Sequence, residues 1–120
     1  MTPVDEDNLP EDFGISIRAE NSTALVLVRG EVDVATAPLL RDELHRLLDP
    51  DHPLEPGPPS RLVLDLSEMS FIDSVGLGVL IGVLKRARES GRELELRNLQ
   101  PAARKVFEIT GLHEVFTISS

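Results

Sequence analysis

The chain contains no cysteine among its 120 residues. This absence excludes a disulfide framework, a thiolate metal site and a cysteine nucleophile, and it is compatible with a reducing compartment. Histidine is also scarce, and His45, His52 and His113 lie far apart without metal-ligand spacing. The sequence therefore predicts no bound metal, and nothing in it points to another cofactor.

Clusters of basic residues and long apolar runs are missing as well. The formal net charge is −9 and the arginines are scattered among acids, whereas a nucleic-acid surface needs clustered Lys and Arg. The longest apolar stretch, residues 75–84, is about half as long as a membrane span. The first residues, MTPVDEDNLPEDFG, lack the basic and apolar regions of a signal peptide. We therefore expect a soluble, cytoplasmic protein that contacts neither nucleic acid nor membrane directly.

The length and the 41% apolar content suit one compact domain and are too small for two. Residues 1–12 carry five acidic and no basic side chains, which predicts a flexible acidic tail. The domain should span 13–120. Residues 50–60 hold five prolines, so they should form a surface loop rather than a regular element.

The remaining pattern predicts strands that alternate with helices. Segments with strand-like patterns are 13–19, 24–30, 61–69, 93–99 and 114–118, and those with helical patterns are 37–49, 74–90 and 101–110. Residues 25–28 are apolar on both faces, which is typical of a strand covered on each side or flanked by neighbours. We predict an α/β domain with a mainly parallel sheet of about five strands, an antiparallel first strand, and helices backing the sheet.

The stretch FIDSVGLG, residues 71–78, lies where the third strand gives way to an apolar helix. A Ser or Asp at such a corner is most simply a helix cap, worth about 1 kcal/mol. A hydrolase elbow needs G-x-S-x-G, but Ile72 occupies the first glycine position and His113 is the only later histidine. A dinucleotide fingerprint fits poorly too, because the glycines are spaced one residue too widely. The residues alone leave a cap, a nucleophile or a phosphoacceptor open.

Small residues also form a stripe along one side of the predicted helix, at Ser74, Gly78 and Gly82. The apolar face should be formed by Leu77, Leu80, Ile81 and Leu84. Interior glycines cost about 1 kcal/mol each relative to alanine, so something must approach this backbone closely. A neighbouring element of the same molecule and a docked partner protein would both explain the stripe.

Three blocks of the sequence resemble a known family. They are GEVDVATAPLLRDEL (30–44), LVLDLSEMSFIDSVGLGVL (62–80) and NLQPAARKVFEITGLHEVFTI (98–118). In order and spacing they resemble the STAS domain of bacterial anti-sigma factor antagonists, over about residues 13–118. The resemblance implies a small α/β domain that has no catalytic chemistry of its own.

The resemblance also implies a switch. In this family the serine after Asp in a D-S-[ST]-G stretch accepts phosphate, which assigns that role to Ser74. The unphosphorylated antagonist binds an anti-sigma factor that is also a serine kinase, and so releases a sigma factor. Phosphorylation ends this binding, and a Ser/Thr phosphatase removes the phosphate. The expected partner surface consists of Asp33, Asp73, Ser74, Val75, Gly76, Gly78 and Gly82.

Charge supports such a switch independently. A phosphate on Ser74 would meet backbone N–H groups at a helix N-terminus, so the fold should tolerate it. Beside Asp73, and on a face that could also present Asp33 and Glu68, it would oppose a docked partner. Val75 replaces the usual second hydroxyl of the motif, and the proline-rich loop is longer than expected for the family. The alternative is a STAS module of another system, such as a stress-signalling scaffold or an accessory of a transporter or of lipid transport.

Overall fold

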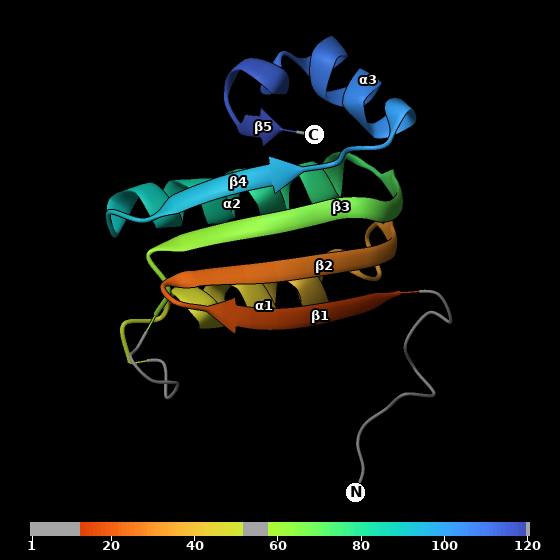
Figure 1. The fold of residues 1–120 in the computed structure, drawn as a ribbon. Coiled ribbons are helices and arrows are strands. Elements are labelled where there is room, and N and C mark those ends of the chain that lie inside the picture. Colours follow the sequence, from red (N-terminus) through yellow and green to blue (C-terminus); the bar gives the residue numbers. More distant parts are fainter. Residues whose placement is uncertain (1–12, 52–57, 120) are drawn as a thin grey trace, which may run out of the picture.

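The computed structural model describes residues 13–51 and 58–119. The predicted acidic tail, and the part of the proline-rich loop from 52 to 57, lie outside the described residues. Within the described segments the elements follow one another as a β-hairpin and then alternating helices and strands (Figure 1). Their bounds are β1 Gly14–Glu20, β2 Thr23–Val32, α1 Ala37–Leu48, β3 Arg61–Ile72, α2 Ser74–Glu89, β4 Glu93–Arg97, α3 Pro101–Thr110, η2 Leu112–Glu114 and β5 Thr117–Ser119. None of the described helices is long and apolar enough to cross a membrane.

The five described strands form one sheet in the order β1-β2-β3-β4-β5. A two-residue turn joins β1 to β2, with Asn21 in the left-handed conformation at φ 56°, so these two strands pair antiparallel. The later neighbours are separated by helices and pair in parallel. The predicted α/β domain with an antiparallel first strand is therefore confirmed.

The third strand is longer than its sequence pattern indicated, because two bulges interrupt its alternation. Between the pairs Leu27–Asp65 and Arg29–Glu68, β3 uses one residue more than β2, and it gains a second between Gly30–Met69 and Glu31–Phe71. A bulge leaves an extra residue unpaired and rotates the next side chains. Met69 consequently faces the core although a strict period of two would turn it outward, and the second bulge returns Ile72 to the core side.

Helices α1 and α2 cover the same face of the sheet, and no helix of residues 13–51 or 58–119 lies on the opposite face (Figure 1). The core between the sheet and these two helices is built from side chains that are less than 9% exposed, including Val26, Val28, Leu62, Leu64, Leu40, Leu44, Leu48, Leu77, Leu80 and Val83. One expectation for α2 was wrong, because Ile81 is 41% exposed and lies outside this core. The predicted strand at residues 25–28 is flanked by β1 and β3 rather than covered on both sides.

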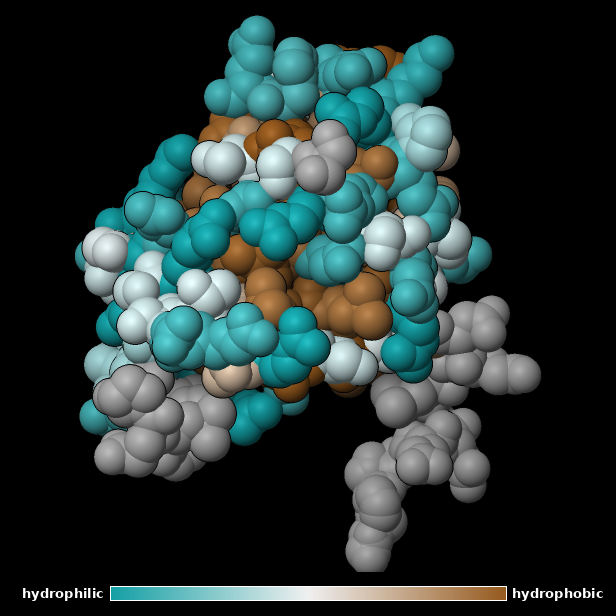
Figure 2. All heavy atoms as spheres, viewed as in Figure 1, coloured by the Kyte–Doolittle hydropathy of each residue, from teal (hydrophilic) through white to brown (hydrophobic). Residues whose placement is uncertain are grey.

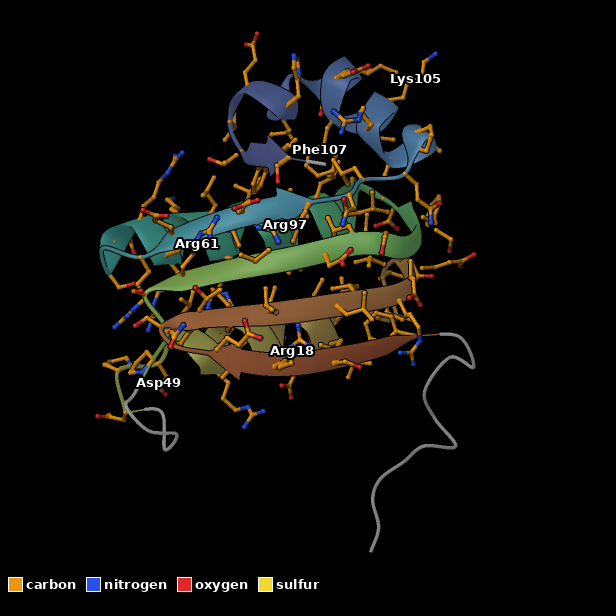
Figure 3. The ribbon with its side chains drawn as sticks, in the orientation of Figure 1. Arg18, Asp49, Arg61, Arg97, Lys105 and Phe107 are labelled. Atoms are coloured by element: carbon orange, nitrogen blue, oxygen red, sulfur yellow. The ribbon has the colours of Figure 1, made fainter. Side chains whose placement is uncertain are left out.

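A buried carboxylate joins the last three strands on the uncovered face. Glu95 of β4 accepts hydrogen bonds from Arg61 of β3, from Nε of Arg97 at 3.1 Å, and from the hydroxyl of Ser119 in β5. Figure 3 labels the two arginines. The Ser119 hydrogen bond and the two arginines lower the pKa of Glu95 below its usual value, although burial opposes them. The charged form of Glu95 therefore stabilises the arrangement of β3, β4 and β5.

We expect Glu95→Gln to lose about 1–3 kcal/mol of unfolding free energy near pH 7, because two arginines lose their charged partner. The pKa of Glu95 is lowered in the folded state, so its contribution is present above the ordinary value of 4.5 and is lost as the pH falls through the folded-state pKa. Urea unfolding over this pH range measures the difference from wild type. Glu93→Gln is the matched control, because that side chain is 80% exposed. A difference that stays constant down to about pH 3 would contradict the assigned role.

Candidate functional site

The corner between β3 and α2 is closed by Asp73. Its Oδ1 accepts hydrogen bonds from the backbone N–H of Val75 at 3.0 Å and of Gly76 at 3.1 Å, and its carbonyl accepts the N–H of Leu77 at 2.9 Å. These bonds satisfy donors at the helix start that would otherwise lack partners. Asp73 is therefore the N-cap of α2, and the cap interpretation of Ser74 is excluded by this geometry.

Ser74 is the first residue of α2 and is exposed. Its hydroxyl makes no hydrogen bond with any other residue in the described part of the chain. A nucleophile would need a base beside it, but His113 lies in η2 with Nδ1 3.3 Å from the carbonyl oxygen of Phe107. Within the described residues the Ser74 hydroxyl thus forms no structural hydrogen bond and no hydrogen bond to a histidine, and it is accessible from solvent.

The loop between β2 and α1 lies beside this corner. Val32 and Ile72 are paired at the ends of β2 and β3, and the N–H of Asp73 donates to the carbonyl of Val32 at 3.2 Å. Asp33 follows Val32 directly, so the two parallel strands deliver both aspartates to one edge of the sheet. The structure therefore brings Asp33 close to Asp73 and Ser74 in the fold, although they are 40 residues apart in the sequence.

Asp33 organises its own loop in the way that Asp73 organises the helix start. Its Oδ1 accepts the N–H of Ala35 at 2.9 Å and that of Thr36 at 3.2 Å. The buried hydroxyl of Thr36 donates to the carbonyl of Glu31 at 2.7 Å and accepts the N–H of Asp33 at 2.9 Å. Thr36 occupies the N-cap position of α1 without a side-chain cap bond, and its hydroxyl instead braces the loop.

The glycines of α2 divide into two kinds. Gly76 is buried, and a Cβ there would lie 2.7 Å from Cγ1 of Ile72 and 2.8 Å from Cγ1 of Val32. This glycine lets the start of α2 pack closely on the ends of β2 and β3. Gly76 was expected in the partner surface, but it is buried and lies beneath that surface. At Gly78 and Gly82, an added Cβ would have no atom of another described element within 4 Å. Nothing in the described part of the molecule therefore makes the close approach that their stripe suggested.

Large apolar side chains are exposed on α2 and on the loop that follows Asp33. Val75 is 42% exposed and Ile81 is 41% exposed on α2, while Val34 is 70% exposed in the loop after Asp33. We call the set Asp33, Val34, Ser74, Val75, Gly78 and Ile81 the Ser74 surface. Val34 and Ile81 were not predicted as part of this surface. The spacing of Ser74, Gly78 and Ile81 does put Ile81 on the same side of the helix as Ser74.

The chain resembles known proteins over nearly its whole length. The family model of the STAS domain matches residues 15–120. An anti-sigma-B factor antagonist from Bacillus subtilis is 33% identical over 109 residues, which are 91% of this chain and 93% of that protein. The crystal structure of an anti-sigma factor antagonist from Mycobacterium paratuberculosis is 29% identical, with a TM-score of 0.72 and coverage of 93% of this chain and 89% of that one.

The antagonist SpoIIAA resembles the chain in fold in both of its known states. The unphosphorylated form has a TM-score of 0.67 at 18% identity, covering 89% of this chain and 87% of that one. The phosphorylated Bacillus form has a TM-score of 0.66 at 20% identity, covering 89% and 92%. The two states therefore resemble this fold equally well.

Gly76→Ala and Gly78→Ala should change stability in opposite directions. A methyl group at position 76 would overlap Ile72 and Val32, which we expect to cost about 1–3 kcal/mol. At position 78 the space is open, so alanine should stabilise α2 by up to about 1 kcal/mol through its helix propensity. Thermal and urea unfolding of the two variants against wild type measure both effects. Equal effects of the same sign would contradict the division between the two glycines.

Proposed function

The chain belongs to the STAS domain family, and from this premise we propose that it is an anti-sigma factor antagonist whose binding is switched off by phosphorylation of Ser74. The unphosphorylated chain binds an anti-sigma factor that is also a serine kinase, and a Ser/Thr phosphatase reverses the modification. The exposed hydroxyl of Ser74, left free because Asp73 caps the helix, is the observation that carries the proposal. The names of the curated relatives support the regulatory role.

The position of Ser74 favours a modification that leaves the fold intact. Ser74 is the first residue of α2, where the helix dipole favours negative charge. Its hydroxyl contributes no hydrogen bond to the described fold, so esterification removes no structural contact. The equal likeness of the chain to both states of SpoIIAA supports a switch that acts on the surface rather than on the architecture.

The composition of the Ser74 surface explains why a partner would respond to phosphate. Exposed Val34, Val75 and Ile81 offer apolar contact, and Gly78 lets a partner approach the helix backbone closely. Asp33 and Asp73 already bring two carboxylates to the same edge. A phosphate adds about two further negative charges, which must be desolvated or matched when a partner docks. Phosphorylation of Ser74 therefore removes both apolar contact and electrostatic complementarity from the interface between the Ser74 surface and its partner.

We expect one phosphate to be transferred to Ser74 by the cognate serine kinase with ATP and Mg²⁺. Intact-mass and peptide mass spectrometry locate the modification on wild type, Ser74→Ala and Ser70→Ala. Ser70 is the matched control, because it is also exposed and lies four residues earlier in β3. Stoichiometric phosphate on any residue other than Ser74 would contradict the assignment.

Binding to the same kinase should distinguish charge from shape. Ser74→Glu should weaken binding at least tenfold, because it places a carboxylate at the centre of the Ser74 surface. Ser74→Ala should bind as wild type does, and Ser70→Glu should control for added charge near the edge of the sheet. Isothermal titration measures the affinities, and circular dichroism verifies that each variant is folded. Equal binding by Ser74→Glu and Ser74→Ala would remove the electrostatic argument.

A further inference from the structure

None of the described helices covers the sheet face opposite α1 and α2, although the central strands of the sheet are parallel. Parallel strands are usually covered on both faces, because both of their faces tend to be apolar. On this face Leu25 of β2 lies beside Val63 of β3, and Leu27 lies beside Asp65. Figure 2 shows hydrophobic side chains gathered in the middle of this face with hydrophilic ones around them. Strand β2 is therefore apolar on both of its faces, and no described helix covers the second face.

These side chains line a hollow of about 440 Å³. Leu25, Leu27 and Val63 supply its apolar lining, and Val63 is only 1% exposed, so it forms the bottom. Ligand sites have volumes of about 300–1,000 Å³ and combine an apolar lining with a few polar groups. Arg18, Asp65 and Arg97 are the charged residues of the lining. The hollow has the size and composition of a small-molecule site.

The three charged residues differ in how far they are already paired. Asp65 accepts hydrogen bonds from the N–H of Ser67 at 3.0 Å and from Nδ2 of Asn98 at 3.4 Å. Arg97 donates a hydrogen bond from Nε to Glu95. Burial raises the pKa of Asp65, but the hydrogen bonds from Ser67 and Asn98, together with the charge of Arg97, lower it below its usual value. Among the residues that the structure describes, Arg18 is paired with the carboxylate of Glu20 alone, at 3.9 Å, and its side chain is 73% exposed. Arg18 is thus the more exposed of the two arginines in the hollow, and no hydrogen bond within the described residues engages its guanidinium.

We propose that this hollow binds an anionic amphiphile, a molecule with one carboxylate or sulfonate and an unbranched apolar body. The anionic group pairs with the guanidinium of Arg18 on β1, which Figure 3 labels, and the apolar body lies over Leu25, Leu27 and Val63. A charge-assisted hydrogen bond to Arg18 fixes the orientation, and burial of the apolar body supplies most of the affinity. This site is separate from the Ser74 surface, which lies at the start of α2 on the helix side.

A second copy of the chain fits this face less well than a slender ligand does. A flat sheet packed against it would bury Arg18, Asp65 and Arg97 together, and buried charges are costly unless each is well paired. Val63 is also recessed below its neighbours, so an opposing sheet would not contact it readily. An extended acyl chain reaches the bottom of the hollow while Asp65 and Arg97 remain hydrated.

The test uses dodecanoate below its micellar concentration, with dodecanol and acetate as probes that lack the charge and the apolar body. Titration of the full chain, followed by amide NMR shifts, should give saturable binding of dodecanoate centred on β1, β2 and β3. Arg18→Gln should weaken it about tenfold, and Leu27→Ser should weaken it as well. Arg41→Gln, an exposed arginine of α1 paired with Asp42, is the matched control and should bind as wild type does.

Three results would overturn the proposal. They are absence of saturable binding, equal affinity for dodecanoate and dodecanol, and unchanged affinity in Arg18→Gln. Analytical ultracentrifugation of the same samples tests the rival occupant, and self-association abolished by Leu27→Ser would assign the face to a second copy instead. Ser74→Ala should bind dodecanoate normally, so the outcome is independent of the phosphorylation switch.

Discussion

The hydrogen bonds from the start of α2 to the carboxylate of Asp73 are the interaction on which the Ser74 surface depends. An N-cap is needed wherever a helix starts at a surface, and Ser and Asp are both suited to the task. Because Asp73 caps the helix, the hydroxyl of Ser74 makes no hydrogen bond within the described fold. The same aspartate donates its N–H to Val32, which joins the helix start to β2. One residue therefore both presents the serine and holds the Asp33 loop next to it.

Packing under the helix start is equally restrictive. Gly76 is enclosed by Ile72 and Val32, so α2 approaches the ends of β2 and β3 more closely than any larger residue would permit. Gly78, two residues later, faces open space. The first glycine thus sets the position of the helix, while the second leaves its backbone bare. Within a single turn of helix, the chain therefore holds both a contact that the fold requires and a surface that no described element contacts.

Much of the fold could be predicted from the sequence, because hydrophobic periodicity and the residues that start and end elements are local signals. The alternation of residues 13–19 and the helical patterns of 37–49, 74–90 and 101–110 were sufficient to place these elements, and the antiparallel first strand was predicted as well. The corner at Ser74 was also located correctly at a strand-to-helix junction. Periodicity does not reveal which side of a sheet the helices cover, so the uncovered face and the exposure of Ile81 were missed. The burial of Gly76 depends on contacts with two other strands and has no local signal.

The bulges of β3 explain how two different surfaces can share the same pair of strands. Both register shifts fall between Leu27 and Glu31 of β2, after the residues of the hollow and before the Ser74 corner. Bulges increase twist and redirect side chains, so the strand end need not continue the pattern of its middle. Leu25 and Val63 face the uncovered side, whereas Val32 and Ile72 turn inward to meet Gly76. The apolar hollow and the phosphoacceptor corner are therefore set by separate parts of the strands, and a change at one surface has no shared side chain through which to alter the other.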